Sequence, residues 1–150
     1  INVATHISDD YVSEDDLKIE IHKLINTIED EKSFDSVKNE LEDRFGKLSE
    51  EIIIYMYNEW FEKLANKLHI EHVRETRNSI EITFPKEVVE KLDTEEIFMD
   101  AFYITTMFRF VSRGSNLIII LDTIKLEKHP IYYLVNLLNK IYDKFGKALD

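Results

Sequence analysis

The sequence of 150 residues has no cysteine, only three glycines and two prolines, and no long hydrophobic run. The absence of cysteine excludes disulfides and thiolate metal sites, and it fits a reducing cytoplasm, where we expect the protein to reside. Glycines at positions 46, 114 and 146 alone cannot build a phosphate-binding loop or a dinucleotide fingerprint. The longest apolar runs, 52–57 and 117–121, are far too short to cross a bilayer, so we expect no membrane partner.

Basic side chains are also scarce, because 19 Lys and Arg face 30 Asp and Glu, a formal net charge of −11. Residues 1–102 carry a balance of −14, whereas residues 103–150 carry +3. This distribution argues against direct binding of nucleic acid, which needs clustered Lys and Arg at the phosphates. Solubility explains the charge counts alone best, and attraction to a basic partner surface is the alternative explanation.

The chain nevertheless has enough apolar residues, 44% in all, to bury a core. Residues 1–7 alternate loosely and indicate a short strand or an extended lead-in. Hydrophobic periodicity then predicts three helices, each opened by a serine N-cap. These run from Ser13 to about Ile28, from Ser33 to Phe45 with Gly46 as a C-terminal αL residue, and from Ser49 to about Leu68.

The second half of the sequence changes to short alternating segments, which predict two β-hairpins. The expected elements are strands at 70–75 and 79–84, a short helix at 86–92, a helix capped by Thr94 that ends near Tyr103, strands at 107–111 and 116–122, and a last helix from Pro130 to about Phe145, with Gly146 beyond it. We therefore predict an α+β fold, in which a small mixed or antiparallel sheet from two hairpins packs with about five to six helices.

Catalytic and cofactor sites find little support in the sequence, and we expect no catalytic residue, no metal and no cofactor. His69, Glu71 and His72 are close in sequence but straddle a predicted helix end, so a surface role explains them better than a metal does. With 30 carboxylates, any chosen acid pair is weak support for a hydrolase or nuclease, which we keep as an alternative.

The predicted second helix offers a candidate contact surface. When Phe34, Val37, Leu41 and Phe45 face inward, Asp43 points outward and Glu40 lies on its flank. The two carboxylates are neighbours on one exposed face, where they can clamp an arginine of another surface. The alternative is an intrahelical ion pair between Glu40 and Arg44, which lie at i and i+4.

The segment from Glu40 to Leu48, with the sequence ELEDRFGKL, resembles the E-L-x-D-R-F-G-x-L signature in the C-terminal domain of bacterial transcription-repair coupling factors (Mfd). The likeness extends to residues 9–12, 17–21 and 64–70. Three residues depart from the family pattern: Ser8 stands where proline is usual, Ser49 where Leu-Pro is usual, and His69 where glycine is common.

This resemblance implies that residues 1–150 are a single C-terminal regulatory domain of a larger multidomain protein, without enzymatic activity of its own. The parent it implies is an ATP-driven DNA translocase that removes stalled RNA polymerase and recruits UvrA in nucleotide excision repair. The domain would be an autoinhibitory cover on the UvrB-like N-terminal module of the same polypeptide, masking the UvrA-binding surface. Glu40 and Asp43 would be partner-binding residues that face basic side chains of that module, with UvrA and RNA polymerase as indirect partners. A free-standing acidic protein-binding domain is the alternative.

Overall fold

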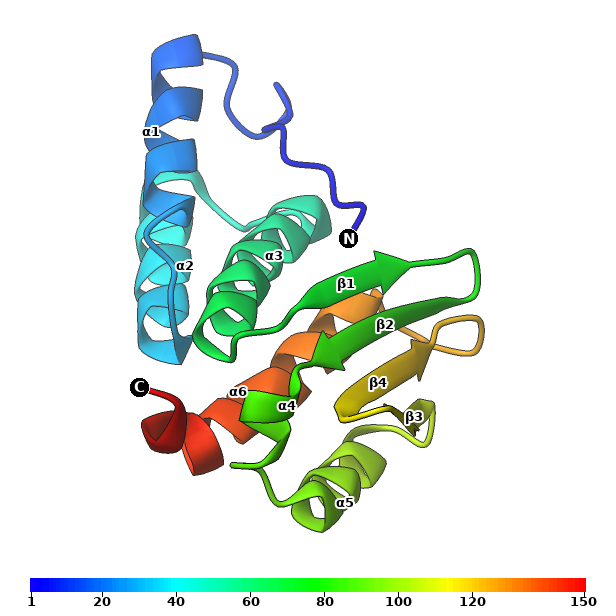
Figure 1. Ribbon diagram of the computed structural model, residues 1–150. Coiled ribbons are helices and arrows are strands. Elements are labelled where there is room, and N and C mark those ends of the chain that lie inside the picture. The colour runs from blue at the N-terminus through cyan, green and yellow to red at the C-terminus, as the bar shows by residue number, and fades with distance from the viewer. The chain divides into compact units, whose positions relative to one another are not determined.

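A computed structural model describes all 150 residues and contains six helices and one four-stranded antiparallel sheet. The predicted α+β class is therefore confirmed, and of the two predicted kinds of sheet the antiparallel one forms. The chain divides into two compact units, residues 2–63 and residues 64–150, and residue 1 belongs with the second unit. Figure 1 shows the elements of both units. None of the helices combines the length and hydrophobicity of a membrane span.

The first unit is helical and consists of α1 (Asp15–Ile25), α2 (Glu31–Phe45) and most of α3 (Glu50–Lys67). Residues 1–8 form no strand, and residues 9–11 form a turn before α1. The helices α1 and α2 run in opposite directions and are joined by residues 26–30 (Figure 1). Apolar side chains at helical spacing form the core of the unit; its fully buried members include Ile21, Ile25, Ile28, Leu41 and Met56.

Three of the predicted helix starts are displaced by one to three residues, because an acidic residue takes the N-cap position. Asp30, not Ser33, caps α2: its carboxylate accepts from the Ser33 amide at 2.8 Å, and the Ser33 hydroxyl accepts from the Asp30 amide at 3.0 Å. This reciprocal capping box makes aspartate as effective a cap as serine. In the same way Asp93, not Thr94, caps α5 (Thr94–Ile104). Glu14, not Ser13, precedes α1, which also ends three residues before the predicted Ile28.

The predicted start of α3 after Ser49 is confirmed. Ser49 directly precedes the helix, and its hydroxyl accepts a hydrogen bond from the Ile52 amide at 3.3 Å. The β-prone run at 52–54 is helical, as the continuing period of apolar residues predicts.

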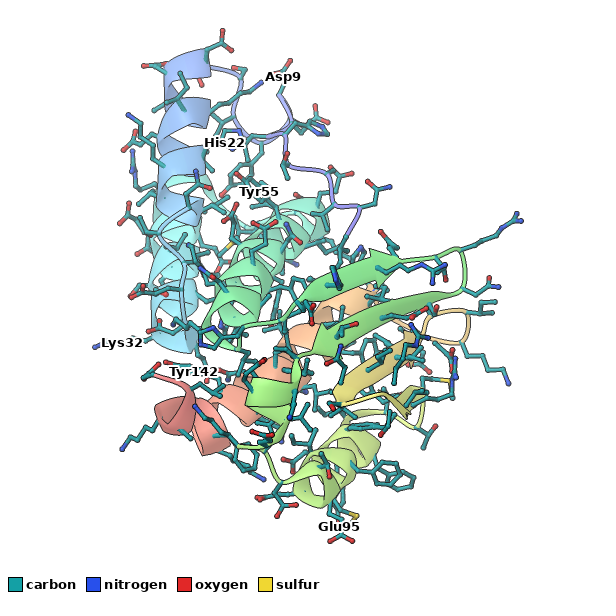
Figure 2. The ribbon with its side chains drawn as sticks, in the orientation of Figure 1. Asp9, His22, Lys32, Tyr55, Glu95 and Tyr142 are labelled. Atoms are coloured by element: carbon teal, nitrogen blue, oxygen red, sulfur yellow. The ribbon has the colours of Figure 1, made fainter.

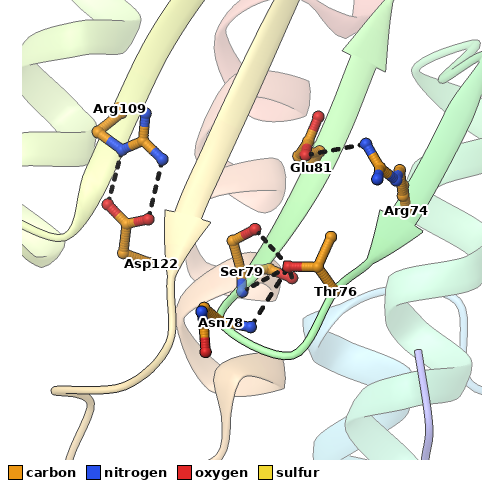
Figure 3. A network of polar contacts seen from close by, with 7 residues as sticks. All are labelled: Arg74, Thr76, Asn78, Ser79, Glu81, Arg109 and Asp122. Carbon is orange, nitrogen blue, oxygen red and sulfur yellow. Dashed lines mark hydrogen bonds and ion pairs between the residues drawn. The ribbon is translucent and has the colours of Figure 1, made fainter.

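The second unit is built on the sheet, whose strand order is β1-β2-β4-β3. Its strands are β1 (His72–Glu75), β2 (Ser79–Phe84), β3 (Phe108–Arg113) and β4 (Asn116–Asp122). Both predicted hairpins form, and antiparallel pairing of β2 with β4 joins them. Figure 3 shows two ion pairs between neighbouring strands, Arg74 with Glu81 at 3.6 Å and Arg109 with Asp122 at 2.7 Å.

Three helices complete this unit: α4 (Lys86–Val89), α5 and α6 (Pro130–Leu149). Alternate residues of β2 are buried, whereas residues 117–121 of β4 are all buried, and α6 lies across one face of the sheet (Figure 1). The expected end of the last helix at Phe145 is wrong, because α6 continues through Gly146. Gly146 is buried beside Tyr142, and a Cβ there would lie 2.7 Å from that ring. Close packing therefore explains a glycine in the helix interior. The helix α4 is shorter than the predicted 86–92.

Candidate partner-binding surface on helix α2

The helix α2 presents Glu40 and Asp43 to solvent. Phe34, Val37 and Leu41 of the same helix are buried, which fixes the orientation of α2 and turns the two carboxylates outward. The helical arrangement expected from the spacing of these residues is therefore present, with both acidic side chains exposed on one helix.

Arg44 connects this surface to α1. Its Nη1 lies 2.8 Å from Oε1 of Glu20 and 3.4 Å from Oε2 of Glu40. The hydrogen bond from Arg44 holds the pKa of the Glu20 carboxyl below its ordinary value of 4.5. In return, the bond to Glu20 raises the pKa of Arg44, with Glu40 as the weaker contributor. The intrahelical pair considered above exists, but its long distance makes it the weaker of the two contacts.

Asp43 forms no ion pair or hydrogen bond in the structure, so its carboxylate is available to a partner. Its surroundings are strongly acidic, since residues 2–63 contain 17 acidic and 7 basic side chains, a balance of −10. By contrast, residues 64–150 contain 13 acidic and 12 basic side chains, a balance of −1. Nearly all of the net charge of the chain therefore belongs to the unit that carries Glu40 and Asp43.

The C-terminal end of α2 is fixed by Tyr11, from the lead-in segment. The Tyr11 hydroxyl lies 3.2 Å from the carbonyl oxygen of Leu41 and 3.1 Å from that of Gly46, to which it donates a shared hydrogen bond. The Tyr11 ring meets the Phe45 ring edge-on, with the ring centres 6.1 Å apart. The Arg44 guanidinium lies 4.9 Å from the centre of the Phe45 ring. Two of the segments that carry the family resemblance, residues 9–12 and 40–48, thus contact each other.

Gly46 has a positive φ of 90°, as expected of a glycine that ends a helix, but its ψ of −174° is extended. The predicted αL conformation is therefore wrong in detail. The chain leaves α2 in a region of backbone space that is almost restricted to glycine. The Gly46 amide still donates to the Glu42 carbonyl at 2.9 Å, which closes the last turn of the helix.

The histidines form no metal site. No three side chains of His, Cys, Asp or Glu are grouped so that they could hold a metal ion. His69 directs its Nε2 to the Leu149 carbonyl at 3.3 Å, and His72 lies 3.8 Å from the Glu71 carboxylate. In the first unit, His22 and Tyr55 point toward one another and form a hydrogen bond of 2.8 Å between Nδ1 and the hydroxyl (Figure 2).

His69 has a left-handed backbone, with φ at 55°, just after α3. It is therefore in the conformation that a glycine adopts most easily.

Sequence reasoning missed two residues that shape this surface. Glu20 lies on the first helix, and it pairs with Arg44 at 2.8 Å. Tyr11 was noted only for its place in a short motif, and it anchors the end of α2. Both contacts bridge distant sequence positions, so no local spacing could reveal them.

Comparison with known proteins finds a matching family, a similar sequence and a similar solved structure. The model of the TRCF domain family matches residues 1–95. A transcription-repair-coupling factor of Staphylococcus haemolyticus (strain JCSC1435) is 25% identical over 103 residues, which are 65% of this chain. The match spans only 8% of the length of that relative. Among solved structures, a crystal structure of the C-terminal domain of transcription-repair coupling factor has a similar fold, with a TM-score of 0.81 at 19% identity over 99% of this chain and 92% of the other.

Proposed function

The chain belongs to the TRCF domain family, and from this we infer that it is a non-catalytic regulatory domain of a transcription-repair coupling factor. We propose that it covers the UvrB-like module of the same polypeptide and so restrains the binding of UvrA. In this function the surface of α2 with Glu40 and Asp43 binds basic side chains of that module. The whole protein would act in the cytoplasm as a DNA translocase in nucleotide excision repair.

The observation that supports this proposal most is that the chain itself does not neutralise the two carboxylates. Asp43 is exposed and has no partner within the chain, and Glu40 has only a long contact to Arg44, which Glu20 holds at shorter distance. Carboxylates that are not neutralised internally can form charge-assisted hydrogen bonds with an arginine of a partner. The second α-helix therefore offers a binding surface that folding alone does not require.

An acidic surface of this kind suits a releasable cover. Exposed ion pairs contribute little free energy each, and salt weakens them. Tethering within one polypeptide compensates for weak contacts, because it raises the effective concentration of the domain at its partner. A modest contact energy allows another binding event, such as engagement of RNA polymerase by the rest of the protein, to shift the equilibrium toward the open state.

The test uses the full-length coupling factor and purified UvrA. Replacing both Glu40 and Asp43 with alanine should increase UvrA binding, because the cover then leaves its site more often. Removing the whole domain gives the upper limit of this increase. If domain removal raises UvrA binding but the double substitution leaves it at the wild-type level, the domain is a cover that uses another surface. If neither change has an effect, the autoinhibitory function is wrong.

A further inference from the structure

The helix α5 is apolar on two opposite faces. Its inner face is buried through Ile97 and Ala101. Its outer face exposes a cluster of large apolar side chains, here called the α5 outer face: Phe98 at 50%, Met99 at 51%, Phe102 at 57% and Tyr103 at 80% exposure. A helix that is apolar all round is normally buried on all sides. The spacing of 98, 99, 102 and 103 instead places these side chains together on one exposed stripe.

This stripe is bordered by two open hollows. One, of about 490 Å³, lies between α5 and the β3–β4 hairpin and is lined in part by Phe98, Phe110 and Leu117. Phe98 and Phe110 meet edge-on with their ring centres 5.4 Å apart, so the floor of this hollow is aromatic. The other hollow, of about 560 Å³, is lined by Phe98 and Met99 and by acidic residues at the start of α5.

The charged residues that line the two hollows are all acidic. The second hollow is lined by Asp93, Glu95 and Glu96, and neither hollow has a basic residue in its lining. Lys144 of α6 neutralises Glu96 and Asp100, at 2.8 Å from each. Glu95 has no such partner and, in Figure 2, projects from α5 away from the strands. An apolar stripe with an unpaired carboxylate at one end is complementary to an apolar surface that carries a cation.

We propose that the α5 outer face docks an amphipathic helix of a protein partner, whose apolar stripe covers Phe98, Met99 and Phe102 and whose Lys or Arg pairs with Glu95. This is the helix-in-groove mode of recognition, in which apolar anchors supply affinity and flanking charge supplies orientation. A second copy of this chain is disfavoured as occupant, because the charged residues that line the two hollows are all acidic and would repel those of the other copy. The same negative charges oppose binding to anionic membrane surfaces.

This surface is independent of the proposed cover function. It belongs to the unit of residues 64–150, whereas Glu40 and Asp43 belong to the unit of residues 2–63. The two proposals can therefore fail separately. Alanine at Glu40 and Asp43 should leave the affinity of the α5 outer face unchanged.

The probe is a fluorescein-labelled, alanine-rich helical peptide of roughly 18 to 20 residues, long enough to form a helix. It carries leucines at i, i+3, i+4 and i+7 and lysines beside that stripe. A second peptide has the lysines replaced by glutamates, and a third has the same composition in scrambled order. Fluorescence anisotropy with the whole chain at low salt measures their dissociation constants.

We expect saturable binding of the lysine peptide and weaker binding of the other two. Phe102→Ser combined with Tyr103→Ser should weaken binding at least about tenfold, as loss of interface anchors does. Ile124→Ser is the matched control, because Ile124 is 73% exposed but lies outside α5. The affinity of this variant for the lysine peptide should equal that of the wild type. Glu95→Lys should weaken binding several-fold at low salt and less at high salt, since screening removes the charge contribution.

The exposed positions of these side chains should leave folding intact, which circular dichroism and thermal unfolding check. Equal affinity of the lysine and glutamate peptides, or of the wild type and the Phe102/Tyr103 variant, would overturn the proposal. Analytical ultracentrifugation of the chain without peptide tests whether a second copy of the chain covers the α5 outer face. A dimer that the Phe102/Tyr103 substitutions dissociate would show that a second copy covers this face and would also overturn the assignment.

Discussion

Arg44 of α2 lies closer to Glu20 of α1 than to Glu40 of its own helix, at 2.8 Å against 3.4 Å. This difference matters for function, because an arginine fully paired within α2 would neutralise the carboxylate that we assign to a partner. The contact with α1 instead draws Arg44 away from Glu40. The acidic surface is thus kept available by an ion pair between helices.

The Glu20–Arg44 contact predicts a measurable titration. The pKa of Glu20 is lowered, so its contribution to stability is complete above pH 4.5 and is lost as the pH falls below 4.5 through the depressed pKa. Carbon NMR of the Glu20 carboxyl should show a midpoint below 4.5, and Arg44→Gln should move it upward. A midpoint that Arg44→Gln leaves unchanged would show that the pair is absent in solution.

Removing the Tyr11 hydroxyl should loosen the end of α2. Tyr11→Phe keeps the ring against Phe45 but removes the hydrogen bond to the Leu41 and Gly46 carbonyls. We expect a loss of about 0.5–1.5 kcal/mol in the free energy of unfolding. Trp60, the single tryptophan, lies in the same unit, so its fluorescence during urea unfolding measures the change. An unchanged midpoint would mean that water replaces the bond without cost.

Gly46→Ala tests the backbone at the exit from α2. Nothing lies within 4 Å of a Cβ at this position, so the cost of the substitution comes from φ at 90° with extended ψ. We expect about 1–3 kcal/mol of destabilisation in the same urea experiment. Since the side chain has open space, a neutral result would contradict the described backbone geometry.

His69→Gly should stabilise the fold, in contrast to Gly46→Ala. The left-handed backbone of His69 is strained for a residue with a Cβ and relaxed for glycine. The greater entropy of glycine in the unfolded chain offsets part of the gain, so we expect up to about 1 kcal/mol of stabilisation by circular dichroism during urea unfolding. Destabilisation would show that the His69 contact with the Leu149 carbonyl outweighs the strain.

Most elements of the fold could be predicted from the sequence because their causes are local. Helical spacing of Phe34, Val37 and Leu41 oriented α2, and pairs of short alternating segments indicated both hairpins. The start of α5 was missed because the adjacent Asp93 and Thr94 are both good N-caps. The interior position of Gly146 depends on the Tyr142 ring, which spacing alone did not associate with it.

The candidate site was predicted only in part. The exposure of Glu40 and Asp43 follows from the helix itself, but the pairing of Arg44 with Glu20 depends on how α1 lies against α2. The α5 outer face was not predicted, because apolar residues at helical spacing ordinarily indicate core. Only the structure shows which apolar side of α5 is covered.

The most direct test of the central claim is the affinity of the isolated chain for the UvrB-like module, measured by titration calorimetry at low salt. Glu40→Ala with Asp43→Ala should weaken binding roughly tenfold, because about 0.7 kcal/mol is lost with each of the two exposed charge pairs. Glu87→Ala with Asp143→Ala removes the same charge from exposed positions of the other unit and should leave the affinity unchanged. Equal affinity of both double variants and the wild type, or an equal loss in both, would contradict the assignment of Glu40 and Asp43.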